Sequence, residues 1–454
     1  MSDYSTMDSA TRLTRRLLLG ALPLAGAAFA RPASTPAGPS GGSPAPTAAA
    51  SVMGLKFTPC ETVRIGVIGT GRRGASLIDT LLAVGNVRIN ALCDTSADCA
   101  ARAQRSVESA AGNAPALYTA GQHDFERLCG RDDIDLIVIA TPWKWHVPMA
   151  VCAMRNGKHA ALEVPAATTI EDCWQLVRVS ERTRRHCVML ENCCYGYNEM
   201  LVLNLVRAGK LGKLTHAAGG YLHDLRSKLI SETEQPWLRD EYIRRNGNLY
   251  PTHGLGPIAR YMDIHRGDRF DDLVSVSSPA RALLESQNRP ARTKADAPLT
   301  SFRCGDQNTS LIRTARGLLI RLEHNVSSPE PYDRINMIAG TRGVFRDFPP
   351  RIYLDGETPP DAWEPLDRCK PAFEHPLWTR IGARARASGG HDGMDFVMCY
   401  RLVECILQGL APDIDVYDAA AWSAVGPLSE RSIAAGGLPV KFPDFTGARW
   451  KSRG

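Results

Sequence analysis

The chain has 454 residues, 44% of them hydrophobic, and a formal net charge of +6 at neutral pH. This length suffices for two or three domains with substantial cores, and the composition is that of a globular protein. The basic residues are spread along the chain rather than clustered, which argues against a nucleic-acid-binding protein.

Residues 1–30 have the pattern of an export signal. Two adjacent arginines, Arg15 and Arg16, precede an apolar run that ends in small residues typical of an A-x-A cleavage site. The run is too short to cross a bilayer, so we expect no stable membrane anchor. The arginine pair favours twin-arginine (Tat) export to the periplasm, with ordinary Sec export as the alternative.

Residues 31–60 are expected to form a linker, because Pro, Ala, Ser, Gly and Thr dominate them up to about residue 53. The thirteen cysteines of the chain show neither the spacing of a compact disulfide framework nor a C-x-x-C pair. Twin-arginine substrates fold in the reducing cytoplasm before export, so buried thiols would stay reduced. We therefore expect no metal site among the cysteines.

The segment that begins at Val63 predicts a dinucleotide-binding strand, turn and helix. A short apolar run leads into a G-x-G-x-x-G motif, and apolar residues then recur at helical spacing. Glycines in such a turn let the backbone approach a pyrophosphate, and the N-terminus of the helix supplies amide donors. The motif glycines are Gly69, Gly71 and Gly74.

A second predicted strand ends in Asp94, twenty residues after the last motif glycine. A carboxylate at this position accepts hydrogen bonds from the ribose hydroxyls and repels a 2′-phosphate, so it favours NAD over NADP. Arg72 and Arg73, inside the motif, could offset part of that repulsion, which leaves NADP open.

Strands and helices continue to alternate along the chain to about residue 190. The apolar run 135–140 is typical of a parallel strand buried on both faces, and the sequence TPWKWH follows it where a crevice would open. Further strand–helix units lead to the sequence ENCCYGYN, which begins at Glu191. The pattern predicts a doubly wound Rossmann domain over residues 61–190.

Several segments resemble the Gfo/Idh/MocA family of nicotinamide-dependent sugar oxidoreductases. They are the glycine turn, the strand ending in Asp94, ATPWKWH, LEVPAA and GGHDGMDF, and the resemblance covers essentially residues 61–454. It implies an α/β fold in which the Rossmann domain is followed by a C-terminal α+β domain, residues 191–454, with a large, open, mostly antiparallel sheet. Such a sheet commonly pairs with a second copy, so a homo-oligomer is expected.

One departure from that family indicates a branch of it. Ordinary dehydrogenases of the family carry Glu-Lys-Pro where this chain has Glu163, Val164 and Pro165, and a valine cannot transfer a proton. Together with ENCCYG (191–196) and GNLYPTHGLGP (247–257), this makes the chain resemble the family 109 glycosidases, which are NAD-dependent α-N-acetylgalactosaminidases. The resemblance implies redox-neutral hydrolysis: oxidation at C3, elimination across C1–C2, addition of water, and re-reduction.

The same resemblance implies roles for individual residues. Tyr195 would take the C2 proton, and His253 would contact the sugar near the oxidised hydroxyl, either as a proton acceptor or only to orient that hydroxyl. The alternatives are a hydrogen-bonded core tyrosine and a turn or capping histidine. The expected cofactor-binding residues are Gly69, Gly71, Arg72, Arg73, Gly74, Asp94, Trp143, His146, Glu163, Val164 and Asn192. The expected substrate-binding residues are Tyr221, Arg239, Tyr250, Pro251, Thr252, His253 and Tyr332.

Two other functions stay open from the sequence. An exported NAD(P)-dependent sugar dehydrogenase would produce NADH, but it would want the lysine that Val164 replaces. A sugar-binding module with a vestigial cofactor would not need Asp94, Tyr195 and His253. The expected substrate is a small molecule or glycan with a terminal N-acetylhexosamine; the sequence does not settle which sugar or which anomer.

Overall fold

The protein is described by a computed structural model, which covers residues 50–231, 233–287 and 301–452. The predicted export signal and the predicted linker up to residue 49 lie outside the described residues. Beyond that point the chain packs onto the folded unit: Val52 and Phe57 are buried, and the Phe57 ring contacts His159 and His186. The last part of the predicted linker is thus folded.

Six parallel strands form the first sheet, in the order β3-β2-β1-β4-β5-β6. The order reverses between β1 and β4, and an open α/β sheet binds its ligands at such a switch point. All four residues of β4 are buried, as expected of a strand covered on both faces. The strands are β1 (Val63–Ile68), β2 (Val87–Cys93), β3 (Ala116–Tyr118), β4 (Leu136–Ile139), β5 (His159–Leu162) and β6 (Cys187–Met189), and the connecting helices are α1 (Arg72–Val84), α2 (Ala97–Ala111), α3 (Phe125–Cys129), the 3-10 turn η1 (Trp143–Trp145), α4 (His146–Arg155) and α5 (Ile170–Thr183).

Nine strands form the second sheet, in the order β14-β13-β12-β11-β7-β10-β9-β8-β15. Only the pair β7–β10 is parallel, and the other neighbouring pairs are antiparallel. The predicted fold class is therefore confirmed. These strands are β7 (Leu214–Leu222), β8 (Phe270–Ser277), β9 (Asn308–Thr314), β10 (Leu319–Asn325), β11 (Met337–Gly340), β12 (Gly343–Arg346), β13 (Arg351–Leu354), β14 (Glu364–Pro365) and β15 (Val440–Lys441).

The remaining helices follow the Rossmann domain. Those that carry or position site residues are η2 (Asn192–Tyr195), α7 (Arg226–Ile230), α8 (Pro236–Arg244), α9 (Thr252–Tyr261) and α13 (Met394–Leu407). None of the described helices combines the length and apolar character needed to cross a membrane. The others are α6 (Tyr197–Arg207), α10 (Ala282–Gln287), η3 (Leu366–Cys369), α11 (Lys370–Phe373), α12 (Pro376–Ser388), η4 (His391–Gly393), α14 (Val416–Ala434) and η5 (Arg449–Ser452).

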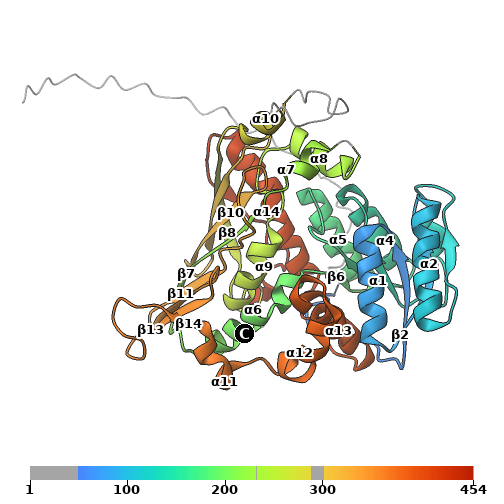
Figure 1. Cartoon of the computed structure of the whole chain (residues 1–454), viewed down its shortest axis with the longest axis horizontal. Helices are drawn as coiled ribbons and strands as arrows, with labels where there is room; N and C mark the ends of the chain where they lie inside the picture. Colours follow the sequence, from blue (N-terminus) through green and yellow to red (C-terminus); the bar gives the residue numbers. More distant parts are fainter. Residues whose placement is uncertain (1–49, 232, 288–300, 453–454) are drawn as a thin grey trace, which may run out of the picture. The chain divides into compact units, whose positions relative to one another are not determined.

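One face of the second sheet is covered by α9, which packs on β7, and by α14, which packs on β8 (Figure 1). Along β9, buried residues alternate with more exposed ones, the period expected of a strand with one face in the core. Three apolar side chains are exposed on neighbouring strands of this sheet: Val276 on β8, Leu311 on β9 and Leu319 on β10. The helix α13 runs beside α1 (Figure 1) and so joins the C-terminal part of the chain to the Rossmann domain.

Candidate active site

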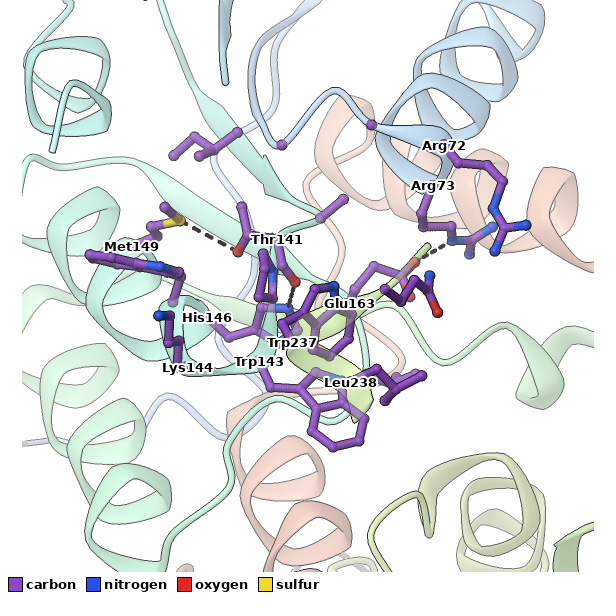
Figure 2. A pocket seen from close by; sticks show the side chains of 18 of the residues that line it. Arg72, Arg73, Thr141, Trp143, Lys144, His146, Met149, Glu163, Trp237 and Leu238 are labelled. Atoms are coloured by element: carbon purple, nitrogen blue, oxygen red, sulfur yellow. Dashed lines mark hydrogen bonds and ion pairs between the residues drawn. The ribbon is translucent and has the colours of Figure 1, made fainter. Parts of the chain in front are cut away.

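A cavity of about 840 Å³ lies at the carboxyl ends of the first sheet's strands. Its opposite wall comes from the α7–α8 segment, with Lys228, Trp237 and Leu238 among the lining residues (Figure 2). No sequence motif predicts that Lys228, Trp237 and Leu238 line the cavity, because these residues belong to short helices with no recognisable spacing of functional residues. Of the predicted site residues, the cavity is lined by Gly69, Gly71, Arg72, Arg73, Asp94, Trp143, His146, Glu163, Val164, Tyr221 and Tyr250.

The glycine turn forms a cradle between β1 and α1. Gly69 has a φ of 87°, and a side chain there or at Gly74 would collide with backbone carbonyls. Around Gly71, in contrast, the space that a side chain would take is open. Gly71 caps α1 without a side-chain hydrogen bond, and the first turn holds no acidic residue. Free amide donors and the positive end of a helix dipole therefore face the cavity and fit a pyrophosphate.

Asp94 lies at the end of β2, on the wall of the same cavity. Its carboxylate accepts hydrogen bonds from the backbone N–H of Thr70, at 2.7 Å, and from that of Ser96, at 2.8 Å. These two bonds fix the carboxylate beside the glycine turn, where it has remaining lone pairs for a ribose diol. The residues present therefore fit an NAD molecule.

The side chain of Arg73 joins two carboxylates. Its guanidinium lies 2.7 Å from Glu163 and 2.7 Å from Asp395 (Figure 2 shows the Glu163 contact). Asp395 also accepts hydrogen bonds from Asn192, at 2.9 Å, and His391, at 2.8 Å. Although burial opposes ionisation, His391 and Arg73 hold the pKa of Asp395 well below its usual range. The guanidinium of Arg73 is paired with these two carboxylates. Arg72 is solvent-exposed, so it is the arginine of the motif that is available to a 2′-phosphate of NADP.

His146 forms part of the cavity floor and is almost fully buried. Its ring nitrogens lie 2.8 Å from the carbonyl oxygen of Pro165 and 2.9 Å from that of Thr141 (Figure 2 shows the Thr141 contact). Burial lowers the pKa of His146 although both carbonyls favour its protonated form. A neutral imidazole donates to one carbonyl only. The contact with Pro165 is the one that links the TPWKWH turn to the segment after β5.

His253 and Glu191 form a hydrogen-bonded pair beside the cavity. Glu191 follows β6 and is fully buried, and its Oε1 lies 2.7 Å from Nδ1 of His253, the second residue of α9. Gly256 makes this approach possible, because a side chain there would press against Cys194, Glu191 and Trp422 at 2.9–3.1 Å. The glycines and proline of LYPTHGLGP thus belong to a helix start packed closely on the core.

The charges of this pair reinforce each other. Burial opposes a charged imidazole, but Cys193 and Glu191 outweigh it and raise the pKa of His253 well above its ordinary value. Burial likewise opposes the Glu191 carboxylate, yet His253 holds the pKa of Glu191 below its ordinary value. Both shifts favour the charged pair, an imidazolium whose Nδ1–H donates to the Glu191 carboxylate.

Aromatic side chains connect His253 to the cavity wall. The ring of Tyr250 lies 5.0 Å from that of His253 and stacks on Trp143 at 6.0 Å. Tyr221 contacts both Tyr250, at 4.8 Å, and His253, at 5.4 Å, and Tyr332 lies 6.1 Å from Tyr221. Such a wall of rings with polar edges suits the apolar face and the hydroxyls of a sugar.

Tyr195 occupies a different environment from the one the family resemblance implies. Its ring is buried, and its hydroxyl donates to Asp413 at 3.3 Å. Burial, together with Asp413, raises the pKa of Tyr195 well above its ordinary value. This is the arrangement of a hydrogen-bonded core tyrosine, and within the described part of the chain the cavity wall does not include it.

The other predicted residues lie around these elements. Asn192 is bonded to Asp395, Pro251 caps α9 and Thr252 starts it, and Arg239 is a half-buried residue of α8. The residues that the sequence did not single out are Glu191 and Asp395, since each acquires its partners only through contacts between distant segments.

Solved structures share the fold described above. Levoglucosan dehydrogenase in complex with NADH and L-sorbose has a TM-score of 0.66 at 19% identity, and the match covers 85% of this chain and 100% of that one. Aldose-aldose oxidoreductase from Caulobacter crescentus has a TM-score of 0.60 at 18% identity, over 84% and 100% of the two chains. These likenesses show the fold alone. Residues 63–191 match the oxidoreductase family with an NAD-binding Rossmann fold, so the chain has a Gfo/Idh/MocA architecture.

Residues 195–452 match the C-terminal domain of glycosyl hydrolase 109. A glycosyl hydrolase family 109 protein of Solibacter usitatus is 58% identical over 408 residues, 89% of this chain and 92% of that protein. An α-N-acetylgalactosaminidase of Shewanella oneidensis is 44% identical over 416 residues, 90% of each chain. The chain belongs to glycosyl hydrolase family 109 and is a glycosidase built on an NAD-binding fold, which confirms the predicted resemblance.

Proposed function

We propose that this glycosidase hydrolyses terminal α-N-acetylgalactosaminides in a redox-neutral cycle that uses bound NAD. The observation that carries the proposal is the position of the His253–Glu191 pair beside the NAD-binding cavity, to which Tyr250 and Tyr221 connect it. The substrate is that of the α-N-acetylgalactosaminidase from Shewanella oneidensis, to which this chain is 44% identical.

The wall beside Glu163 favours this cycle over net sugar oxidation. Val164 lines the cavity where ordinary dehydrogenases carry a proton-transferring lysine, and it is 3% exposed. Glu163, its neighbour, is held by Arg73 at 2.7 Å. A side chain that exchanges a proton with the sugar must then come from another segment, and Tyr250 in the cavity wall and His253 beside it are the groups in reach.

When bound, NAD would supply the acceptor for the C3 hydride and return that hydride at the end of the cycle. The chain's own residues handle the proton and the charge. A C3 ketone acidifies the C2 proton, which we assign to the phenolate of Tyr250 beside the charged His253 ring. Loss of that proton places negative charge on the C3 oxygen, and the aglycone then leaves from C1. The protonated ring of His253, kept charged by Glu191, is the group that we assign to that oxygen.

Tyr250 is the phenol that we assign to the reacting face of the sugar. It lines the cavity, stacks on Trp143 at 6.0 Å and lies 5.0 Å from the His253 ring. Tyr195, the family's expected base, donates to Asp413 instead. We therefore assign the Tyr250 ring to hold the sugar beside Trp143 and its hydroxyl oxygen to accept the C2 proton.

One assay tests the function. The purified protein is incubated with p-nitrophenyl α-N-acetylgalactosaminide without added NAD, and nitrophenol and NADH absorbance are followed together. Release of nitrophenol without net NADH is the expected result. Accumulating NADH would identify a dehydrogenase instead, and silence on both readouts would identify a binding module. In D₂O, deuterium at C2 of the product is expected, and its absence would overturn the elimination step.

The second sheet is the surface that we propose for self-association. Val276, Leu311 and Leu319 are 56%, 44% and 46% exposed on neighbouring strands, and apolar side chains gathered on one sheet favour burial against a second copy. Sedimentation analysis of the full chain is expected to show a homo-oligomer. The double variant Leu311→Asp, Leu319→Asp is expected to be monomeric, and an unchanged mass would place the contact elsewhere.

The arginine pair in the first thirty residues supports export to the periplasm through the twin-arginine route. A protein that folds around its cofactor before export can work where free NAD is scarce. The variant Arg15→Lys, Arg16→Lys is expected to remain in the cytoplasmic fraction of a Gram-negative host. Normal periplasmic accumulation of that variant would overturn the route.

A further inference from the structure

Three potential metal ligands meet next to the His253–Glu191 hydrogen bond. A carboxylate oxygen of Glu191, the sulfur of Cys193 and a ring nitrogen of His253 all lie within 4.8 Å of one another. Glu191 is 0% and Cys193 1% exposed, and the His253 side chain is 15% exposed. This group does not follow from any ligand spacing in the sequence, because α9 brings His253 to the end of β6 from sixty-two positions away.

The carboxylate of Glu191 has an oxygen to spare. Its Oε1 accepts from His253 and from the backbone N–H of Cys193, at 2.7 Å and 3.1 Å. Its Oε2 is buried and makes no hydrogen bond of ordinary geometry to the described residues. The side chain of Thr252 lies close enough to act on this carboxylate, but its hydroxyl is likewise buried without a partner. A buried acceptor without a partner is costly, and more so when it is charged. A bound cation would satisfy this oxygen.

We propose that Glu191, Cys193 and His253 form a binding site for a thiophilic divalent cation, with Zn²⁺ as the best match. One sulfur, one nitrogen and one oxygen ligand suit Zn²⁺, which in open sites takes three protein ligands and a water molecule. A thiolate ligand disfavours Mg²⁺ and Ca²⁺, which prefer oxygen ligands only. The spacing of the cysteines predicts no metal site, and the close packing of α9 on Glu191 is what changes that expectation.

The surrounding charges are compatible with a cation. The guanidinium of Arg334 also approaches Cys193, but it is paired with Glu199 at 2.6 Å. Its positive charge is therefore balanced locally. The backbone N–H of Cys193, bonded to Glu191, supplies the outer hydrogen bond that commonly orients a ligating carboxylate.

A cation at this site would inhibit the enzyme. The cation would coordinate a nitrogen of His253 and an oxygen of Glu191. The imidazole ring could then no longer donate a hydrogen bond to the C3 oxygen of the sugar. This consequence rests on the proposed function, whereas binding of the cation does not.

Cobalt binding tests the site directly. The full exported chain, freed of any affinity tag and treated with a chelator, is titrated with Co²⁺, and the near-ultraviolet charge-transfer band of a thiolate–cobalt bond is recorded. The wild type is expected to bind one equivalent with this band. Cys193→Ala is expected to lose the band and to bind Zn²⁺ at least about 10-fold more weakly, since removal of even an outer-shell partner costs that much.

Cys194→Ala is the matched control. It removes the neighbouring buried thiol, whose sulfur lies against Gly256, and it is expected to keep the band. Retained NAD binding shows that both variants are folded. A band that is absent from the wild type, or that survives in Cys193→Ala, overturns the site.

Inhibition is measured on the same samples. Zn²⁺ is expected to suppress nitrophenol release by the wild type, reversibly with chelator, and the half-inhibiting concentration is expected to rise at least about 10-fold in Cys193→Ala. Zinc bound without inhibition overturns the inhibitory role. If no sample hydrolyses the glycoside, the proposed function fails, while the cobalt band still decides the site.

Discussion

Nδ1 of His253 lies 2.7 Å from Oε1 of Glu191, although the two residues belong to different segments, the start of α9 and the end of β6. The carboxylate is 0% exposed, so its charge acts on the imidazole with little screening by water. The pair joins the last strand of the Rossmann sheet to the helix that covers the second sheet. Because we assign His253 to the sugar, a substitution of either residue should change sugar turnover more than NAD binding.

The pH dependence of Glu191→Gln tests this relationship. In the wild type the pKa of His253 is raised, so the ring stays protonated, and activity should fall only as pH rises through that elevated pKa. Glutamine keeps the acceptor oxygen but removes the charge, which lowers the pKa of His253. The fall should then move to lower pH by at least about one unit, equivalent to about 1.4 kcal/mol. The measurement is the pH profile of kcat for nitrophenol release.

Glu126→Gln, on the exposed surface of α3, is the control and should leave the profile unchanged. An unshifted basic limb in Glu191→Gln would mean that His253 does not need its charge. A limb that moved to higher pH would indicate that the neutral ring acts as a base.

Two tyrosines distinguish the geometry of this chain from the role that the family resemblance implies. Tyr250→Phe, in the cavity wall, should lower kcat by about 100-fold, the lower end of what a positioned proton-transferring group contributes. Tyr195→Phe removes a 3.3 Å hydrogen bond to Asp413. It should cost about 1.5 kcal/mol of unfolding free energy and leave kcat within a few-fold. Steady-state kinetics and urea unfolding of both variants provide the measurements.

The opposite pattern, with Tyr195→Phe folded and inactive and Tyr250→Phe active, would restore Tyr195 as the base. It would also require the side chain of Tyr195 to leave Asp413 when the sugar binds.

Much of this arrangement was predictable from local patterns. The turn at Gly69, Gly71 and Gly74, the acid at Asp94 and the alternation of strands and helices are all properties of short segments. The structure brings Gly69, Gly71 and Asp94 to one cavity. The mostly antiparallel second sheet followed from the family resemblance and is confirmed.

The rest depends on contacts between segments far apart in the chain. The glycine motif predicts that Arg73 contacts the cofactor, but the partners of its side chain, Glu163 and Asp395, lie 90 and 322 positions away. Tyr195 follows a buried strand, which is equally compatible with a cleft and with the core; only Asp413, 218 positions away, decides between them. Spacing in a sequence carries no information about such pairs.

The neighbouring arginines Arg72 and Arg73 make a matched test of the first of these long-range contacts. Arg73→Ala leaves Glu163 and the buried Asp395 without their guanidinium. It should lower the free energy of unfolding by about 3 kcal/mol, the lower end for a broken buried pair, because Asn192 and His391 still contact Asp395. Arg72→Ala, at an exposed position, should change it by less than about 0.5 kcal/mol. Urea unfolding followed by circular dichroism measures both, and equal effects would show that Arg73 is not the clamp described above.

Gly256→Ala tests whether close packing of α9 sets the His253–Glu191 distance. Alanine is favoured over glycine in a helix by about 1 kcal/mol, but here its Cβ would meet Cys194 Sγ at 2.9 Å and Glu191 Cγ at 3.0 Å. The crowding should cost about 1–3 kcal/mol, so the variant should be no more stable than the wild type, and the displaced α9 should lower kcat by about 10-fold or more. Gly426→Ala, inside α14 with its nearest contact at 3.5 Å, should instead gain about 1 kcal/mol and keep full activity. A Gly256→Ala protein as active as the wild type would show that His253 reaches Glu191 without help from the packing of its helix.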